Sequence, residues 1–392
     1  IFAVLFVVFT IATHYTLIYA GEGGLTLLSF VSGFSDITPF ILNLLQGTGS
    51  VPASLITACT MQAIVSNIAV NMCYALFFSG KQSPLRSWIL GGFGCVIAAN
   101  VVVLFFFYLI PDKIAIERKF YKCQGYKLNW NNLKTYSEKM QWLKLNNRKS
   151  WYSDCVDKLK VREYVTRKLG TDKYLIPLFF ETTDWREVKP ENMPDEPFVI
   201  KCNHDNASYT IVKDKNDVDW KQLKLYYKRR LNGRSFFWCN REWPYKKVKP
   251  RVMVEKFLVS SGRDYKLQEF KFHCFHGKIK VIAFYEIGID GVERYRHLNA
   301  DYTMLSENCS FGSYNEVKKE FDKPIVADEM NMIALKLAKD FEFYIRVDIY
   351  HVDGKLFVGE LTFFDGAGYD VIRPYDWNLE LGSYLHLPID KN

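Results

Sequence analysis

The chain has 392 residues, of which 24% are charged, and its net charge is +8. The first 110 residues hold only four charged side chains, Glu22, Asp36, Lys81 and Arg86, so the composition excludes a wholly soluble protein. The rest of the chain carries the whole positive excess and is long enough for one or two globular domains. We therefore expect a membrane part followed by a basic soluble part.

Cysteine usage and charge pattern exclude several classes of protein. Nine cysteines are scattered singly without a Cys-x-x-Cys pair, which indicates neither a disulfide framework nor a zinc ribbon. Acidic and basic residues interleave without a basic run, so we expect no nucleic acid as a partner. We expect the positive excess to match anionic lipid or phosphate-bearing substrates instead. The chain begins at Ile1 without signal-peptide features, and we expect a fragment or processed form with sequence missing upstream.

Four apolar stretches are long enough to span a membrane as helices: 1–20, 25–46, 54–79 and 88–111. They predict an all-α transmembrane bundle of about four helices over residues 1–111. Two basic residues, Lys81 and Arg86, compete with five shortly after residue 111. The positive-inside rule then predicts a multi-pass protein of the inner (cytoplasmic) membrane with its C-terminal domain in the cytoplasm.

Polar side chains interrupt the two middle stretches, Asp36 in one and Asn67 and Asn71 in the other. At membrane depth such groups face another helix or a cavity, so helix contact and a transport or binding site both stay open. The segments that carry them, GLTLLSFVSGFSDITPFILNLL and AIVSNIAVNMCYALFFSG, resemble the uncharacterised membrane domain that follows MgtC/SapB-type modules. The resemblance covers most of residues 1–110.

Residues 112–150 are basic and aromatic, and we expect a juxtamembrane linker that ends in an amphipathic helix at YSEKMQWLKL. A second helix is predicted over 153–169, with Gly170 at its C-cap, and a third over 328–340. Seven runs read as strands: FVIKC, SYTIVKD, VMVEKFLV, EFKFHCF, IKVIAFYE, YIRVDIY and KLFVGELTFF. This mixture predicts an α+β domain over residues 151–392.

The run YIRVDIYHVDGKLFVGELTFF predicts a β-hairpin whose turn length decides which side chains share a face. A two-residue turn at 353–354 would place Asp348 and Glu360 on opposite faces. A three-residue loop at 352–354 leaves one wholly apolar face, and we favour it because burial of that face selects the register. The other face then gathers four polar residues: Arg346, Asp348, Glu360 and Thr362.

Two interpretations of these carboxylates stay open. One is a salt bridge between Arg346 and Glu360, with Asp348 solvated. The other is a magnesium site, because hard divalent cations prefer carboxylate oxygens and share them with substrate phosphates. Phosphates also need basic partners, for which Lys158 and Lys201 are candidates, although either could be a surface charge.

Six blocks, taken in order, resemble the ATP-grasp enzymes and, more closely, their TupA-like branch, which is associated with cell-surface polysaccharide synthesis. The blocks are LNWNNLKTYSEKMQWLKL, VDKLKVREYV with YLIPL, FVIKCNHD, NREWPYKKVKPRVMVEKFL, FKFHCFHGK and RVDIYHVDGKLFVGELTFF. The resemblance runs from about residue 126 to 385. It implies an ATP-grasp-like catalytic domain in which ATP, with Mg²⁺, lies between two α+β lobes.

The resemblance also implies roles for single positions. Phosphate contacts fall to Lys158, Lys201 and Lys271, and a loop without glycine, from His204 to Ser208, stands where a loop closes over the phosphates. Adenine and ribose would be read by the segment from Glu255 to Leu258. The implied metal ligands are Asp348, Glu360 and Thr362, with threonine in place of the usual asparagine.

Three further positions could take part in catalysis or be structural. The block Asn240 to Tyr245 is peculiar to the TupA-like branch, and its Arg241 suits a carboxylate or a sugar ring but could equally lie in a packed turn. We assign catalytic contacts to Arg241, Lys271 and Arg346. His204 and His273 could act as acid or base, or be structural.

The leading hypothesis is a membrane-anchored ATP-dependent carboxylate–amine ligase of the cell envelope. An acceptor carboxylate would form an acyl phosphate that an amine then displaces, a reaction that depends on positioning and electrostatics. Family association suggests uronic acids or amino-acid-bearing sugars of a surface polymer as acceptors. Two alternatives are a glycosyltransferase-like or polymer-binding module without ligase activity, and a transporter with a regulatory nucleotide-binding domain.

Overall fold

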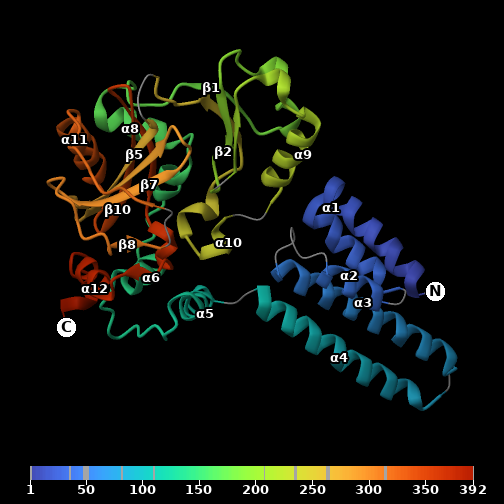
Figure 1. The fold of residues 1–392 in the computed structure, drawn as a ribbon. Coiled ribbons are helices and arrows are strands. Elements are labelled where there is room, and N and C mark those ends of the chain that lie inside the picture. Colours follow the sequence, from blue (N-terminus) through green and yellow to red (C-terminus); the bar gives the residue numbers. More distant parts are fainter. Residues whose placement is uncertain are drawn as a thin grey trace. The chain divides into compact units, whose positions relative to one another are not determined.

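The computed structural model describes residues 2–34, 37–46, 53–80, 83–108, 111–206, 208–233, 236–261, 265–312 and 316–391. Its elements form two compact units, Ile1–Pro111 and Asp112–Asn392 (Figure 1). The described part of the first unit is helical, whereas the second combines helices with three sheets.

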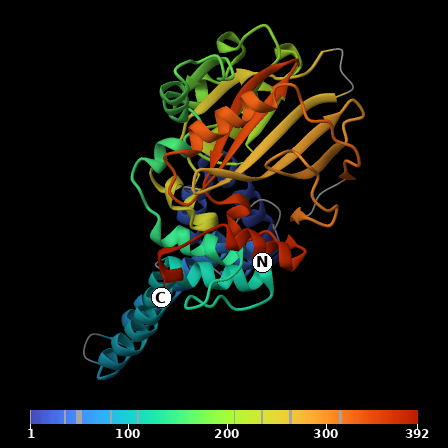
Figure 2. The ribbon, with the colours of Figure 1, turned by 90° about the vertical axis from the view of Figure 1, so that its left-hand side faces the viewer.

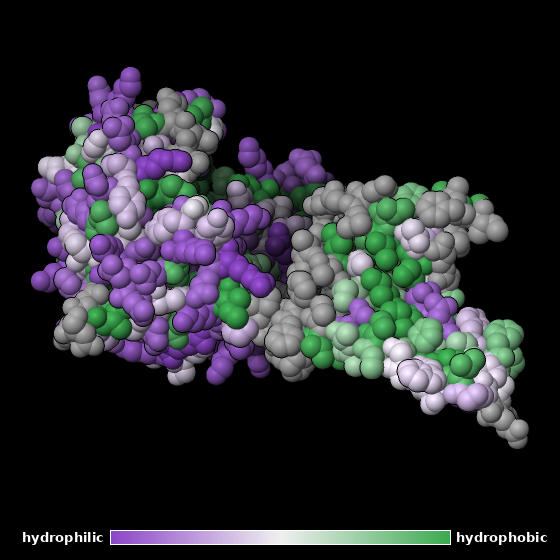
Figure 3. Space-filling view, turned by 90° about the horizontal axis from the view of Figure 1, so that it is seen from below, coloured by the Kyte–Doolittle hydropathy of each residue, from purple (hydrophilic) through white to green (hydrophobic). Residues whose placement is uncertain are grey.

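The described residues of the N-terminal unit form four helices: α1 (Phe2–Ser32), α2 (Thr38–Gln46), α3 (Ala53–Phe78) and α4 (Leu85–Tyr108). Two segments of the described residues are long and apolar enough to cross a membrane, Cys59–Phe78 and Leu85–Val102, and almost none of either is buried within the chain. Figure 3 shows hydrophobic side chains gathered on this unit and hydrophilic ones on the other. A transmembrane bundle therefore stays a prediction.

The predicted span 25–46 is wrong. Helix α1 continues to Ser32, and the separate helix α2 begins at Thr38. Pro39 explains the break, because a proline is tolerated in the first turn of a helix but cannot continue a preceding one. Nine residues of helix rise about 14 Å, less than half of a hydrocarbon core. Asp36 lies outside the described residues.

Helices α1 and α3 pack closely through small and polar residues. The Ser66 hydroxyl donates to the carbonyl of Phe30 at 2.8 Å, and Nδ2 of Asn67 donates to the carbonyl of Gly33 at 3.1 Å. A Cβ at Gly33 would overlap the Ser66 side chain. Asn71 donates to Asn67 at 3.0 Å. The bond from Asn67 to Gly33 supports the helix-contact interpretation for Asn67, whereas the bond of Asn71 lies within α3.

The C-terminal unit contains two larger sheets that face different cores. The smaller, ordered β1-β4-β2-β3, is antiparallel, and α9 packs against it. The larger, ordered β11-β10-β5-β6-β7-β9, is antiparallel except at β7 and β9, and α11 covers one face (Figures 1 and 2). Its strands are β5 (Tyr265–Phe275), β6 (Lys278–Gly288), β7 (Glu293–Asn299), β9 (Glu316–Val317), β10 (Tyr344–Val352) and β11 (Lys355–Thr362).

The strands of the smaller sheet, a third sheet and the helices complete the C-terminal unit. The smaller sheet comprises β1 (Leu178–Thr182), β2 (Phe198–Cys202), β3 (Tyr209–Val212) and β4 (Val252–Lys256). A two-stranded sheet pairs β8 (Ser310–Phe311) with β12 (Ile372–Arg373). The helices are α5 (Asp112–Gln124), α6 (Tyr136–Asn146), α7 (Tyr152–Val156), α8 (Val161–Leu169), α9 (Trp220–Leu231), α10 (Phe237–Asn240), α11 (Ala327–Ala338) and α12 (Tyr375–Ser383).

Alternating side chains explain why each sheet has a core of its own. Along β2, Phe198, Ile200 and Cys202 are buried while the residues between them are half-buried, the period expected of a strand. Ile200 packs in a small cluster with Val254 and Tyr227. The larger sheet belongs to a separate and more extensive cluster. Separate cores define two lobes.

Residues 112–150 differ from the expected linker. Helix α6 has a capping box between Thr135 and Glu138, and eight of its residues are buried, including Tyr136 and Met140. Because Tyr136 packs against Phe275 and Tyr344 of the larger sheet, this segment belongs to the core of the C-terminal unit. The basic composition of this segment predicted an exposed linker. Basic residues are not all exposed here, however, because Lys144 is buried over the ring of Tyr369.

The predicted helix 153–169 is two helices, α7 and α8, separated at residues 157–160. Asp157 stabilises the break, because its Oδ1 accepts the backbone N–H of Leu159 at 2.9 Å. The predicted C-cap is confirmed, with Gly170 in the left-handed conformation at φ 75°. Lys158 therefore lies in the bend between two helices rather than on a helix surface.

The hairpin of β10 and β11 corrects the predicted register. Val352 pairs with Lys355, so the turn is the two-residue Asp353-Gly354, with φ angles of 50° and 79°. A β-bulge at Gly359 then shifts the register, and Asp348 pairs directly with Glu360. The three-residue loop was wrong, yet the two carboxylates are neighbours because the bulge compensates for the shorter turn.

Candidate active site

A cavity of about 560 Å³ lies between the two lobes of the C-terminal unit, and we call it the inter-sheet cavity. Its walls come from the smaller sheet, the bend at Lys158 and the larger sheet. It brings together six of the predicted site residues: Lys158, Lys201, Ser208, Glu255, Leu258 and Glu360. These residues are separated by up to about two hundred positions in the sequence, so only the tertiary structure makes them neighbours.

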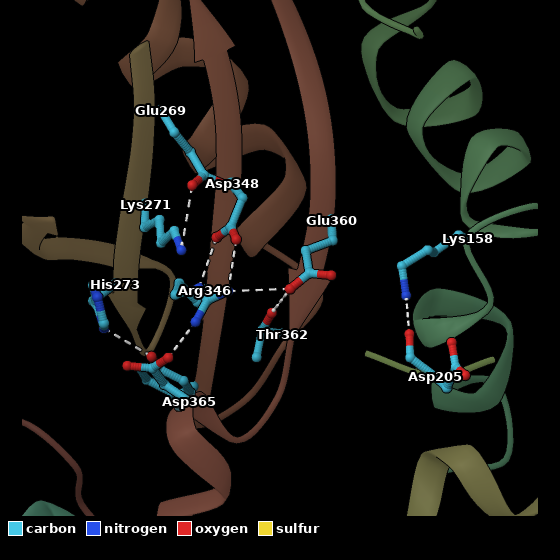
Figure 4. A network of polar contacts seen from close by, with 11 residues as sticks. Lys158, Asp205, Glu269, Lys271, His273, Arg346, Asp348, Glu360, Thr362 and Asp365 are labelled. Atoms are coloured by element: carbon cyan, nitrogen blue, oxygen red, sulfur yellow. Dashed lines mark hydrogen bonds and ion pairs between the residues drawn. The ribbon is translucent and has the colours of Figure 1, made fainter. Parts of the chain in front are cut away.

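Lys158 faces this cavity from the bend between α7 and α8. Its backbone N–H donates to the carbonyl of Asn203 at 3.1 Å, and its Nζ donates to the carbonyl of Asp205 at 2.6 Å. Figure 4 shows this ammonium group across a gap from Glu360. Burial lowers the pKa of Lys158, and Glu360 acts in the opposite direction. A half-buried cation that faces a cavity is suited to an anionic ligand.

Glu360 is the matching anion on the other wall. Burial opposes its ionisation, but Lys158 and Arg346 outweigh that effect and lower the pKa of Glu360. Its Oε1 accepts bonds from Arg346 at 3.1 Å and from the Thr362 hydroxyl at 2.9 Å. The carboxylate is therefore held ionised and oriented at the edge of the cavity.

Lys201 and Glu255 lie on neighbouring strands of the smaller sheet and form an ion pair. Arg162 approaches the same carboxylate at 3.4 Å. With two cations on it, Glu255 is not available for a ribose hydroxyl in this arrangement. Lys201 would have to leave Glu255 to reach a phosphate. Leu258, which follows β4, contributes an apolar part of the lining.

The loop from Asn203 to Ser208 is held by its own side chains. Ser208 donates to a carboxylate oxygen of Asp205 and accepts the backbone N–H of Cys202 at 3.3 Å. Asn203 bonds to Asp157 and to the backbone of Arg251 at 2.8 and 2.7 Å. Residue 207 lies outside the described residues. These bonds occupy the hydroxyl that the resemblance assigned to phosphate.

His204 is a buried residue of this loop and does not line the inter-sheet cavity. Burial lowers the pKa of His204, so its ring is neutral. Its Nδ1 is buried without a hydrogen-bond partner in the described part of the chain. Its position supports a structural role better than the predicted phosphate contact.

Arg346 forms the centre of a buried ionic network (Figure 4). Its Nε and Nη2 donate to both carboxylate oxygens of Asp348, at 2.7 and 2.6 Å. The same guanidinium also pairs with Glu360 and Asp365. Asp348 is only 2% exposed, so the interpretation with a solvated Asp348 is wrong, although its Arg346–Glu360 pair is present. Burial raises the pKa of Asp348 to about 7, against the effect of Arg346.

The fit of these residues to Mg²⁺ is partial. Carboxylate oxygens are the preferred ligands, and Glu360 lines the cavity. Both oxygens of Asp348 are bonded to Arg346, however, and the Thr362 hydroxyl donates to Glu360. No cluster of three His, Cys, Asp or Glu side chains suited to a metal ion occurs among the described residues. Glu360 fits a metal as it stands, and Asp348 fits only after a bond to Arg346 breaks.

A second cavity of about 420 Å³ adjoins the first, because Tyr285 and Glu293 line both. We call it the Arg346 cavity. Lys271, predicted as a catalytic cation, lines it and pairs with Glu269 at 3.3 Å. Its complete lining is Lys271, His273, Tyr285, Glu293, Tyr295, Phe311, Gly312, Arg346, Asp365 and Asp370.

Arg241 lies outside the linings of both cavities. Its guanidinium stacks on the ring of Trp238 at 4.6 Å and approaches Asp112 at 3.7 Å. It closes helix α10 with a left-handed φ of 59°. The structure therefore matches the packed-turn alternative, and the position gives no support to a catalytic contact.

Several residues that shape the site were not predicted from the sequence. Asp365 holds Arg346, and Glu269 holds Lys271. Tyr285 and Glu293 connect the two cavities. A signal existed for Asp365, which follows Glu360 by five residues in ELTFFDGAG. Glu269, Tyr285 and Glu293 lie on strands of the larger sheet. The strand β7, which begins at Glu293, was not predicted.

The two-lobed arrangement agrees with the matched protein family. Residues 138–386 match the family model described as TupA-like ATP-grasp, which covers more than half of the chain. This chain belongs to the TupA-like ATP-grasp family. Residues 1–79 match a domain of unknown function, DUF4010. The resemblance proposed from the sequence, including the fusion of two families, is confirmed.

Solved structures show weaker likeness. The D-alanine–D-alanine ligase of Bacillus anthracis complexed with ATP is 17% identical with a TM-score of 0.29, over 53% of this chain and 55% of that one. The ligase of the same name from Helicobacter pylori is 16% identical with a TM-score of 0.33, over 59% and 61%. The ATP-grasp ligase PsnB with minimal precursor, Mg and ADP is 14% identical with a TM-score of 0.30, over 63% and 66%.

This chain thus spans less than two thirds of the length of each of these three structures. No curated protein matches it. Likenesses at these TM-scores carry no conclusion about its activity.

Proposed function

We propose that this chain is an ATP-dependent carboxylate–amine ligase that takes ATP with Mg²⁺ in the inter-sheet cavity. The observation that carries this proposal is the placement of Lys158 opposite Glu360 across that cavity, in a chain of the TupA-like ATP-grasp family. Lysines bind the phosphates, and Glu360 binds the cation that accompanies them.

The cavity is suited to a nucleotide in size and lining. Its volume of about 560 Å³ lies in the usual range for small-molecule sites. Apolar side chains such as Ile176, Val199 and Leu258 provide a surface for a base, and the two lysines provide the charge for phosphates. A nucleotide needs both an apolar surface for its base and positive charge for its phosphates, and this cavity offers the two together.

The proposed reaction needs no nucleophilic side chain. The acceptor carboxylate attacks the γ-phosphorus, giving an acyl phosphate and ADP, and an amine then displaces phosphate to form an amide. Lys158 and Lys201 offset charge on the phosphoryl oxygens, and Lys271 and Arg346, which line the adjoining Arg346 cavity, orient the acceptor. Mg²⁺, when bound, neutralises charge on the same oxygens.

The setting proposed for this reaction is the cytoplasmic face of the inner membrane, with the apolar helices of the N-terminal unit as anchor. The apolar segments Cys59–Phe78 and Leu85–Val102 and the DUF4010 match support it. Family association supports surface-polysaccharide acceptors, namely uronic acids or amino-acid-bearing sugars.

Turnover measurements on the full chain in lipid nanodiscs test the ligase. Phosphate release from ATP is screened against a panel of uronic acids and amino acids. Lys158→Met and Glu360→Gln should each lower the acid-dependent rate at least 100-fold. The control is Lys160→Met, which removes an exposed lysine that lies two residues after Lys158 and pairs with Asp154. Equal rates in all variants, or no acid-dependent turnover in the native chain, would overturn the proposal.

A second candidate is a binding module without ligase activity. The bonds from Arg346 to both oxygens of Asp348 favour it, because they leave one implied metal ligand occupied. Calorimetry separates the candidates. Tight binding of a nucleotide sugar without binding of ATP supports the module, and the reverse supports the ligase.

A further inference from the structure

The positive charge of this chain is concentrated in residues 220–251, which we call the basic segment. These residues include eleven basic side chains and a single acidic one, Glu242. The resulting net charge of +10 exceeds the +8 of the whole chain, so the rest of the chain is slightly acidic. The interleaving of acidic and basic residues expected from the sequence does not hold in this segment. A positive excess gathered in one place attracts an anionic partner.

Several cations of the basic segment are exposed. Lys221 and Arg229 of α9 and Lys247 and Lys249 beyond α10 are exposed, and none of the four pairs with a carboxylate of the described residues. None of them lines the inter-sheet cavity or the Arg346 cavity. Helix α9 is held on the smaller sheet by buried Tyr227, whose hydroxyl donates to a carbonyl of β2 at 2.8 Å. Neither pairing within the chain nor a substrate phosphate accounts for these exposed charges.

The basic segment is bonded to the helix that follows the membrane part. Nζ of Lys119 in α5 donates to the carbonyl of Cys239 at 3.1 Å. The guanidinium of Arg241 approaches Asp112, the first residue of α5, at 3.7 Å. Asp112 comes two positions after Ile110, the last residue of the apolar run, so the two lie within about 7 Å of each other. With α4 as a spanning helix, the middle of the basic segment therefore lies at the membrane surface.

An exposed tryptophan adds a second feature that is typical of a membrane interface. The side chain of Trp238 is 43% exposed, and the guanidinium of Arg241 lies 4.6 Å from the centre of its ring. Tryptophan and arginine each combine an apolar body with a polar end, and such side chains are favoured where lipid meets water. A lipid surface thus matches both the charge of the basic segment and this ring.

We infer that the basic segment binds the anionic phospholipid headgroups of the membrane in which the chain is anchored. Basic residues next to an anionic leaflet are attracted to it without a specific pocket, and the covalent link to α4 keeps the lipid at high effective concentration. This contact holds the lobe of the smaller sheet beside the bilayer. The inference rests on the membrane anchor of the proposed function and is independent of the ligase reaction.

Hydrogen exchange of the full chain in lipid nanodiscs tests this inference. Amide exchange in α9 and in residues 237–247 is compared between discs of phosphatidylcholine alone and discs that also contain phosphatidylserine. The anionic lipid should slow exchange in both stretches by at least about fivefold. High salt should remove the effect, because mobile ions screen exposed charges, and this measurement needs no variant. Combining Lys221→Glu, Lys247→Glu and Lys249→Glu should also abolish the slowing, since the reversed charges repel phosphatidylserine.

The control combines Lys278→Glu, Lys336→Glu and Lys339→Glu, which make the same change in net charge at exposed lysines outside the basic segment. It should leave the slowing within about twofold of the native chain, because these charges lie outside the proposed contact. Equal exchange in neutral and anionic discs, or an equal loss of slowing in the control, overturns the lipid-binding face.

Competing anions distinguish lipid from other partners of the same charge. Polygalacturonate, duplex DNA and inorganic phosphate are each added to the chain in neutral discs. If one of them slows exchange in α9 and residues 237–247 while phosphatidylserine does not, the lipid assignment is overturned in favour of that anion. None of these measurements depends on turnover, so failure of the lipid contact and failure of the ligase are seen separately.

Discussion

Arg346 bonds to both carboxylate oxygens of Asp348, at 2.7 and 2.6 Å, across a single intervening residue of β10. Bidentate pairs of this kind are among the strongest side-chain interactions in proteins. Here the pair is buried, and the same guanidinium also holds Glu360 and Asp365. Arg346 thus organises the acidic wall that separates the two cavities.

Removing this guanidinium should destabilise the protein strongly. Arg346→Met leaves three carboxylates clustered without their counter-ion, and loss of one partner of a buried pair typically costs about 3–5 kcal/mol. Thermal melts of the C-terminal unit in the full chain would show it. Arg186→Met, which removes an exposed arginine paired with Asp184, should leave the melting temperature almost unchanged. Similar melting temperatures for the two variants would contradict the role of Arg346.

Lys158→Met should stabilise the protein without ligand and weaken ATP binding. Burial lowers the pKa of Lys158 below its ordinary value of 10.5, so at neutral pH the folded chain carries a charge that the unfolded chain solvates better. This cost is fully present below the folded-state pKa and disappears as pH rises toward 10.5. We expect a higher Tm at pH 7, a smaller gain at pH 10, and at least a tenfold higher Kd for ATP.

Calorimetric titration with ATP and Mg²⁺ measures the second effect. Lys160→Met is the matched control, because Lys160 is exposed, pairs with Asp154 and does not line the inter-sheet cavity. A variant Lys158→Met that binds ATP as tightly as the native chain would contradict the placement of phosphates at this lysine.

Asp370→Asn should stabilise the protein above pH 6 and not at pH 3.5. Burial raises the pKa of Asp370 from 3.8 to about 6, and Asp365 adds to the effect. Between these values the folded protein keeps a proton that the unfolded chain has lost, so stability falls as pH rises through this window. Because much of the Asp370 side chain still meets water, which weakens the effect of its partial burial, we expect a gain of about 1 kcal/mol or less, or ~2–4 °C in Tm.

Melting curves at pH 3.5 and pH 7.5 measure this difference. The control Asp376→Asn, at an exposed aspartate of α12, should show no comparable dependence. If Asp370→Asn lowers Tm at pH 7.5, the carboxylate stabilises the fold, and the physical picture of an uncompensated acid is wrong.

Gly359→Ala should disturb the bulge that aligns the two carboxylates. A Cβ at this position would lie 2.7 Å from Cε2 of Tyr350, so the ring or the strand must move. We expect a loss of about 1–3 kcal/mol in stability, as for other overpacked sites, and lower ligase activity because Glu360 is the next residue. Adding Tyr350→Leu should relieve the clash and recover stability.

The double variant separates steric crowding from a requirement for glycine flexibility. Gly359 has no positive φ among the backbone angles of the described chain, so the clash is the main barrier. If Tyr350→Leu fails to rescue Gly359→Ala in thermal melts, the steric explanation does not hold.

Local patterns predicted much of this protein. Charge depletion over residues 1–110 separated the two parts, and the alternation in FVIKC predicted the strand that carries Lys201. Gly170 predicted the end of α8, because glycine readily adopts the left-handed conformation that a helix C-cap requires. Each of these signals depends on neighbours within one turn or one strand, so it can be read along the chain.

Other features depend on contacts between distant segments. The sequence could not show that α1 runs past residue 25, that the 153–169 helix bends at Lys158, or that a bulge offsets the shorter hairpin turn. Nor could it show that Arg241 packs on Trp238 while Asp365 joins Arg346. Spacing along the chain identified the residues with suitable chemistry, but the packing of two sheets decided which of them face the same cavity, since burial and charge pairing act through space.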